Sequence, residues 1–243
     1  MLSEKPWQPE SVLRLAAGVS FCLVVGMAAA MLLGHWGPGM DKTTKDFVTF
    51  VCGGLSFQGA ALVLVHFFLR EYGLGWREGF GLSLANWPRL VMLAVLAILV
   101  ALPAALALGK LTELVLRLAG QTPELQVAVK ILQGKLPAGQ IAVYGIVAVV
   151  LAPLAEEVLF RGILYPTLKR SGHPRAALWI TSLLFASIHM NLLAFVPLTF
   201  LALTLAWLYE RTGNLLAPIL THVLFNGINF TLLLLVPDLV KGS

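Results

Sequence analysis

The sequence predicts an all-α membrane protein, a polytopic bundle of about seven or eight transmembrane helices. Of its 243 residues, 58% are hydrophobic and only 12% are charged, and the mean hydropathy is +0.86. A soluble domain carries about 25% charged residues, because its surface must remain in solution. Half the usual charge, distributed between long apolar runs, is typical of a chain whose surface faces lipid.

Seven apolar runs approach or reach the length of about 20 residues that a membrane span needs. They cover residues 12–33, 47–69, 90–108, 141–164, 176–190, 192–209 and 215–236. Between 109 and 140, charged residues alternate with Leu, Val and Ile at helical spacing, which favours short amphipathic helices in the membrane interface. An eighth span results if part of 111–136 is inserted. We therefore expect one integral membrane domain, with N-terminal helices and the interfacial segment in 1–140 and a four-helix core in 141–236.

The distribution of charge favours a membrane role over nucleic-acid binding. The formal net charge is +5, with a pI of about 9.4. Its basic residues, such as Arg70, Lys169 and Arg211, lie between the apolar runs, as residues that set membrane topology do. Their placement favours a cytoplasmic N-terminus. The expected partner is the lipid bilayer, and no nucleic acid is expected.

The fourth apolar run contains three ionisable residues. Such residues are costly inside a membrane and mark candidate functional sites. Glu157 and Arg161 are four residues apart and share a helical face, so we expect an ion pair. Glu156 points about 100° away from that face and is left to face a cavity. The alternative is a purely structural Glu–Arg pair at the membrane border.

Two histidines strengthen the case for a functional site. His189 follows Phe185 by four residues, and His222 precedes Asn226 by four, so each pair lies on one helical face. Polar groups in hydrocarbon need partners, which one shared cavity would supply. A carboxylate beside a histidine can deprotonate water, and a second histidine with an asparagine can donate to an oxyanion. The sequence therefore predicts a water-activating amide hydrolase.

Three alternatives stay open at this point. His189, His222 and a glutamate are possible zinc ligands, although the sequence has no HExxH motif. A zinc-dependent metalloprotease is therefore an alternative to a hydrolase that needs no metal or other cofactor. The same polar pocket would also suit a non-catalytic membrane scaffold. Finally, Glu and His side chains in a membrane can form the proton relay of a transporter.

The same residues form three motifs in a fixed order. Over residues 141–230 the chain resembles the CPBP family, which comprises the CAAX prenyl endopeptidase Rce1 and bacterial Abi-type homologues. The resemblance rests on Glu156-Glu157-x-x-x-Arg161 for EExxxR, Phe185-x-x-x-His189 for FxxxH, and His222-x-x-x-Asn226 for HxxxN.

This resemblance implies an intramembrane glutamate protease. Glu156 with His189 would activate water, and His222 with Asn226 would stabilise the oxyanion. Glu157, Arg161 and Phe185 would shape the site. The substrate would be a membrane-associated peptide or protein, with CAAX-like prenylated sequences as one candidate. The compact chain resembles the bacterial branch of the family, so the expected location is a bacterial plasma membrane.

Overall fold

The fold was analysed in a computed structural model that describes residues 4–36, 39, 41–134 and 136–236. Every regular element among these residues is a helix, which confirms the all-α class. Six helices are long and apolar enough to cross a membrane within this part of the chain. They are Pro9–Leu33, Lys42–Glu71, Trp87–Leu118, Ala138–Lys169, Leu192–Thr212 and Leu216–Leu235. The protein is a polytopic integral membrane bundle.

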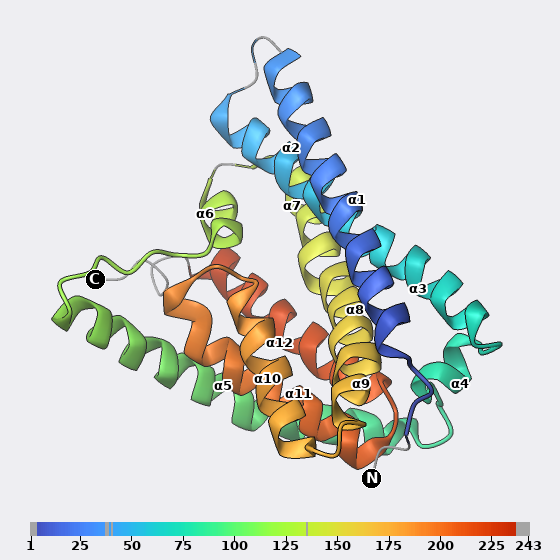
Figure 1. Cartoon of the computed structure of the whole chain (residues 1–243). Helices are drawn as coiled ribbons and strands as arrows, with labels where there is room; N and C mark the ends of the chain where they lie inside the picture. Colours follow the sequence, from blue (N-terminus) through green and yellow to red (C-terminus); the bar gives the residue numbers. More distant parts are fainter. Residues whose placement is uncertain (1–3, 37–38, 40, 135, 237–243) are drawn as a thin grey trace.

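The helical elements follow one another with short connections (Figure 1). In chain order they are α1 (Pro9–Trp36), α2 (Lys42–Gly54), the π-helical η1 (Leu55–Gly59), α3 (Ala60–Glu71), α4 (Trp76–Phe80), α5 (Trp87–Leu118), α6 (Val127–Gln133), α7 (Ala138–Gly145), the π-helical η2 (Ile146–Leu151), α8 (Ala152–Glu157), the π-helical η3 (Val158–Leu164), α9 (Tyr165–Lys169), α10 (Pro174–Ser187), α11 (Leu192–Thr212) and α12 (Leu216–Leu235).

Two segments differ from the sequence expectation. The run 176–190 folds as α10, whose 14 residues are fewer than a full span needs, so six rather than seven helices have spanning length. Residues 111–118 form the last turns of α5 instead of a separate interfacial helix. Leu, Glu and Arg, which make up most of this stretch, are good helix formers, so the helix continues. A single short helix, α6, occupies the rest of the expected interfacial segment.

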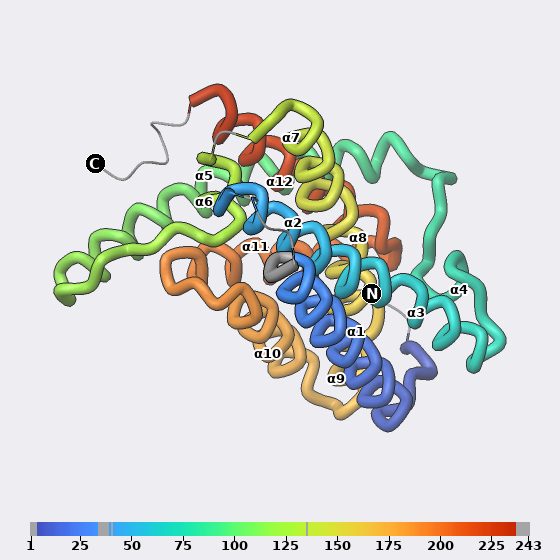
Figure 2. Tube along the Cα trace, turned by 90° about the horizontal axis from the view of Figure 1, so that it is seen from above, coloured from blue at the N-terminus to red at the C-terminus, as the bar shows by residue number. Residues whose placement is uncertain are grey.

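The continuous rod from α7 to α9 lies between two groups of helices (Figures 1 and 2). On one side, α1 packs along α2, η1 and α3, and α2 and η1 contact the rod. On the other side, α5 packs against α11 and α12, α10 packs against α11, and α12 contacts α8 and η2. Polar side chains on the rod therefore have neighbours from both α10 and α12.

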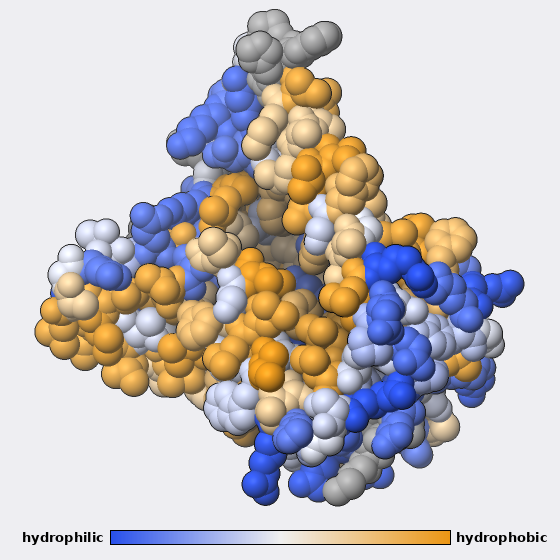
Figure 3. All heavy atoms as spheres, viewed as in Figure 1, coloured by the Kyte–Doolittle hydropathy of each residue, from blue (hydrophilic) through white to orange (hydrophobic). Residues whose placement is uncertain are grey.

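Large apolar side chains cover much of the outer surface. Phe21 on α1 is 69% exposed and Leu99 on α5 is 65% exposed. In Figure 3 the apolar atoms extend over α5, α10 and α1, whereas polar atoms gather near the N-terminal end of the chain. Contiguous apolar surface of this extent would be unfavourable in water, and it suits a bilayer.

Candidate active site

Glu157 is the centre of a buried polar network on the rod. Its Oε1 atom accepts a hydrogen bond from Arg161 Nη1 at 2.7 Å and lies 2.9 Å from His222 Nδ1. Glu157 has no exposed surface, and both partners are 2% exposed. The ion pair predicted from the spacing of Glu157 and Arg161 is confirmed. The contact between Glu157 and His222, which are 65 residues apart, could not be predicted from local spacing in the sequence.

Arg161 is held by three kinds of contact. Besides Glu157, its Nη2 atom donates to the carbonyl oxygen of Ala202 at 3.1 Å. Its guanidinium carbon also lies 4.6 Å from the centre of the Phe185 ring, a cation–π distance. A buried charge is tolerated when it is paired and hydrogen-bonded. Arg161 therefore cross-links the rod, α10 and α11 behind the site.

The four predicted catalytic residues line a single cavity. Glu156, His189, His222 and Asn226 all contribute to its wall, and its volume is about 800 Å³. Glu157 is absent from the wall, as is Arg161. The structure thus separates the two adjacent glutamates as their 100° angular offset predicts.

The rest of the wall comes from other helices and is largely apolar. Leu102 and Leu106 on α5 face the cavity, as do Leu198 on α11 and Phe225 on α12. Residues from the segment before and within α6 close another side. Asn191 ties this segment to the start of α11, because its Nδ2 atom donates to the carbonyl oxygen of Glu124 at 2.8 Å.

Phe185 fixes the two histidine rings. It is fully buried, and the centre of its ring lies 5.0 Å from that of His189 and 5.8 Å from that of His222. Phe185 and His189 are therefore neighbours on one side of the chain, as their spacing predicts, with their rings tilted by 53°. One ring nitrogen of each histidine is also engaged. His189 Nδ1 lies 2.8 Å from the carbonyl oxygen of Phe185, and His222 Nδ1 lies 2.9 Å from Glu157 Oε1.

The engaged nitrogens decide what each ring offers to the cavity. A carbonyl or carboxylate oxygen can only accept a hydrogen bond, so Nδ1 must be the donor in both histidines. A neutral ring with its proton on Nδ1 has Nε2 as an acceptor. The Nε2 atom of His222 lies 3.8 Å from Glu156 Oε2, which is too far for a direct hydrogen bond.

Asn226 is anchored by the backbone of the rod. Its Nδ2 atom donates to the carbonyl oxygen of Ala148, in η2, at 2.9 Å. One amide hydrogen is therefore used, and the other is left for a ligand in the cavity. Asn229, one turn later on α12, also lines the cavity, and its Nδ2 atom donates to the carbonyl oxygen of Phe225 at 2.8 Å.

The π-helical turns flank the glutamates. The motif glutamates end α8, with η2 before it and η3, which contains Arg161, after it. π-helical turns inside α-helices occur frequently at functional sites. Pro153 lies in the first turn of α8 and has no N–H to donate to the preceding turn. Periodicity analysis of the sequence does not detect such turns.

Metal ligands do not gather at this cavity. Among the described residues, no three His, Cys, Asp or Glu side chains lie close enough together to hold a metal ion. Cys22 and Cys52 are both free thiols on the N-terminal helices, and neither lines the cavity.

Comparison with known proteins identifies the C-terminal part of the chain. Residues 138–228 match the family model of the type II CAAX prenyl endopeptidase Rce1-like proteins. This segment resembles the Rce1-like family. The match includes all three motifs, so the resemblance seen in the sequence is confirmed.

Two proteins of Bacillus subtilis (strain 168) are similar over part of their length. "Uncharacterized protein YpbD" is 34% identical over 82 residues, which are 32% of this chain and 39% of that protein. "Putative membrane peptidase YdiL" is 32% identical over 81 residues, which are 33% of this chain and 33% of that protein. The chain thus spans little more than a third of the curated relatives it matches. No solved structure gives a significant match.

Proposed function

We propose that the protein is an intramembrane endopeptidase that hydrolyses a peptide bond of a membrane-associated substrate. The strongest support is the convergence of Glu156, His189, His222 and Asn226 on one cavity, although they come from α8, the turn after α10, and α12. The Rce1-like family model and the peptidase name of one relative point to the same reaction.

Glu156 and His189 activate the water in this proposal. Among the described residues that line the cavity, Glu113 is paired with Lys110 and Arg117, whereas Glu156 has no Lys or Arg bonded to it. Glu156 can therefore accept a proton from water directly, as a general base must. His189 presents Nε2 as an acceptor, because its Nδ1 proton is engaged by the Phe185 carbonyl. Together they orient a water molecule and take its proton as the water attacks the scissile carbonyl.

His222 and Asn226 stabilise the oxyanion that forms. Asn226 contributes its second amide hydrogen, with the first held by Ala148. His222 donates through Nε2 only when both ring nitrogens carry protons. The charge of that form would balance Glu156, since Glu157 is already balanced by Arg161. Donors fixed in advance in a water-poor site are usually the largest contribution to acyl-transfer catalysis.

Glu157, Arg161 and Phe185 act on the chemistry through other residues. Glu157 fixes the His222 ring, Arg161 neutralises Glu157, and Phe185 packs against both histidines. Because these three residues lie behind the cavity wall, we assign them to positioning.

The substrate enters from a membrane environment. The cavity is walled by leucines and phenylalanines from spanning helices, which suits a peptide with an apolar or lipid-modified segment. A CAAX-like prenylated sequence is one such substrate. We place the protein in a bacterial plasma membrane with the N-terminus in the cytoplasm, as the distribution of Lys and Arg favours.

Peptide cleavage by the purified protein in nanodiscs tests this assignment. Wild type should cleave a membrane-associated peptide, the Glu156→Ala variant should not, and a chelator should leave the rate unchanged. Zinc that is stoichiometric, lost together with activity and restored with it, would instead support a metalloprotease. A folded wild-type protein that binds peptides without cleaving them would support the scaffold.

A further inference from the structure

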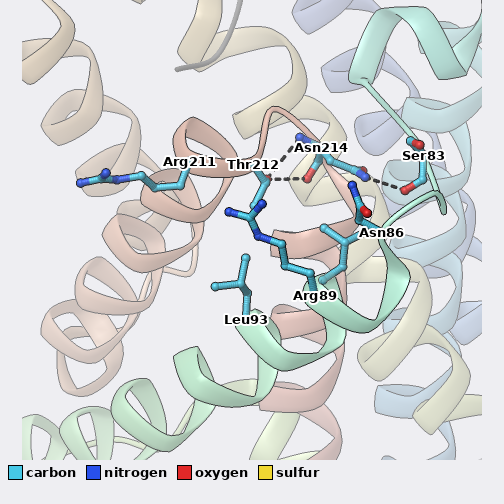
Figure 4. A pocket seen from close by; sticks show the side chains of 8 residues that line it. Ser83, Asn86, Arg89, Leu93, Arg211, Thr212 and Asn214 are labelled. Atoms are coloured by element: carbon cyan, nitrogen blue, oxygen red, sulfur yellow. Dashed lines mark hydrogen bonds between the residues drawn. The ribbon is translucent and has the colours of Figure 1, made fainter.

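A second cavity lies where α5 begins and α11 ends, apart from the proposed active site. Its volume is about 200 Å³, and it shares no lining residue with the larger cavity. Figure 4 shows its polar side chains, which come from the loop before α5, the first turn of α5, the end of α11 and the loop after α11. They are Ser83, Asn86, Arg89, Arg211, Thr212 and Asn214.

The base of this cavity is fixed by contacts between two loops. Asn214 is buried, its Nδ2 atom donates to the carbonyl oxygen of Ser83 at 2.7 Å, and its Oδ1 atom accepts from the backbone of Leu216 at 3.0 Å. Gly81 and Gly213 both have left-handed φ angles, and a Cβ atom on Gly81 would lie 2.1 Å from the carbonyl oxygen of Gly213. The loops are therefore held together before any ligand arrives.

The two arginines at this cavity lack acidic partners. Neither Arg89 nor Arg211 forms a salt bridge within the described residues. Arg211 instead lies over the Trp207 ring at 5.4 Å, and in Figure 4 Arg89 extends toward Thr212. The side chain of Asn86, the residue before α5, makes no capping hydrogen bond to the described residues of that helix. The site thus offers two guanidinium groups and one amide that have no anionic partner among the described residues.

The cavity also lies at the membrane border. Both α5 and α11 are spanning helices, and the cavity joins the first turn of one to the last turn of the other. Trp87 is 60% exposed and Trp207 is 49% exposed beside it, and tryptophans collect at the level of lipid headgroups. Leu90 and Leu93 continue the wall toward the membrane interior.

We propose that this cavity binds the phosphate of an anionic phospholipid, with Arg89 and Arg211 as its ligands. Guanidinium groups match phosphate oxygens in a bidentate geometry, and basic pockets between spanning helices on the cytoplasmic side bind anionic headgroups. The leucines below accommodate the start of the acyl chains. An anionic lipid is preferred to a zwitterionic one, since no carboxylate is present in the cavity to receive a headgroup cation. Binding here is independent of the proposed peptidase reaction.

Native mass spectrometry of the full chain, released from nanodiscs of phosphatidylglycerol or phosphatidylcholine, tests the site. Wild type should retain phosphatidylglycerol and not phosphatidylcholine. The double variant Arg89→Ala/Arg211→Ala should bind phosphatidylglycerol about thirtyfold more weakly, because each basic residue near the membrane surface contributes about 1 kcal/mol to binding an anionic lipid. Thermal unfolding in detergent, with and without added phosphatidylglycerol, gives a second measure of the same affinity.

The matched control is Arg77→Ala/Arg175→Ala, which removes two exposed arginines, one from α4 and one from the first turn of α10, at the same end of the bundle. It should retain phosphatidylglycerol as wild type does, and an equal loss in this control would overturn the site. The variant Arg89→Lys/Arg211→Lys, which keeps both charges, should fold normally and bind between the two extremes. If inorganic phosphate stabilises wild type as strongly as the lipid, and both effects need Arg89 and Arg211, the ligand is free phosphate and the lipid assignment is wrong.

Discussion

The N-terminal and C-terminal parts of the bundle are both mainly helical but differ in what they bury. Apart from Lys5, every buried charged, amide, imidazole, Ser or Thr side chain among the described residues lies at or beyond Glu156. The ion pairs of the N-terminal part, such as Arg117 with Glu113, involve exposed arginine or lysine side chains. Those of the C-terminal part include Arg161 with Glu157, at 3% and 0% side-chain exposure.

This difference indicates that the two parts have different roles, with the N-terminal part giving support and the C-terminal part carrying the chemistry. A buried charge network costs stability unless it is fully paired, so a chain that needed only to span the membrane would not keep one. The N-terminal helices contribute lipid-facing surface and, through α5, one wall of the cavity. The part of the chain from α8 to α12 contributes the buried polar groups. Matched substitutions in the two parts can break or sharpen this contrast.

The largest contrast is expected between two glutamates that line the same cavity. Glu156→Gln should lower the rate of peptide cleavage by about 10²–10⁴-fold, because general-base help is lost. Glu113→Gln, on α5, should change the rate by less than about tenfold, since it removes only ion pairs with exposed partners. Cleavage rates and melting temperatures of both purified variants check this. Near-wild-type turnover by Glu156→Gln would remove Glu156 from its proposed role.

A contrast in stability follows from the two arginine–glutamate pairs. Arg161→Ala leaves Glu157 buried without its cation, which should lower the free energy of unfolding by about 3–5 kcal/mol. Arg117→Ala removes an exposed arginine from a surface pair and should cost about 1 kcal/mol or less. Thermal unfolding in one detergent compares them. Equal melting temperatures for the two variants would mean that the buried pair is not a structural element.

Much of this site could be predicted from the sequence, because its signals are local. The Glu157–Arg161 pair and the contact between the Phe185 and His189 rings both follow from four-residue spacing. The orientation of Glu156 toward the cavity follows from its angular offset. Apolar runs likewise locate the spans, since their length is set by the thickness of the bilayer.

What could not be predicted depends on contacts between distant segments or on backbone detail. The bond between His222 and Glu157 joins residues 65 apart, and that between Asn226 and Ala148 joins residues 78 apart. No periodic pattern encodes such pairings. The extension of α5 through residue 118 is also not encoded in the pattern, because charges alternating with apolar residues are equally typical of an interfacial helix and of the polar end of a longer one.

Two asparagines on α12 separate catalysis from binding. Asn226→Ala should lower turnover by about 10²–10³-fold, equivalent to about 2.7–4 kcal/mol, with little change in substrate affinity, because an oxyanion donor acts in the transition state. Asn229→Ala is the matched control, since it lines the same cavity one turn away. Single-turnover cleavage and binding of an uncleavable peptide provide the two readouts. Equal losses of binding and turnover in Asn226→Ala would argue against the oxyanion role.

The smallest effect is expected at a residue that links the two parts of the chain. Trp7 is fully buried near the N-terminus, and its Nε1 atom donates to the carbonyl oxygen of Gly162, next to Arg161, at 2.9 Å. Trp7→Phe keeps an aromatic ring against Phe68 and Tyr72 but leaves that carbonyl without its donor. The free energy of unfolding should fall by about 1–3 kcal/mol.

The rate of cleavage decides what the Trp7 contact is for. If the N-terminal part only supports the rod, Trp7→Phe should melt earlier yet keep its turnover at temperatures where it is folded. Trp87→Phe, at an exposed tryptophan, should alter the free energy of unfolding by no more than about 0.5 kcal/mol. A Trp7→Phe protein with wild-type melting and strongly reduced turnover would contradict these separate roles. The N-terminal segment would then control the position of Arg161 and, through Glu157, the position of His222.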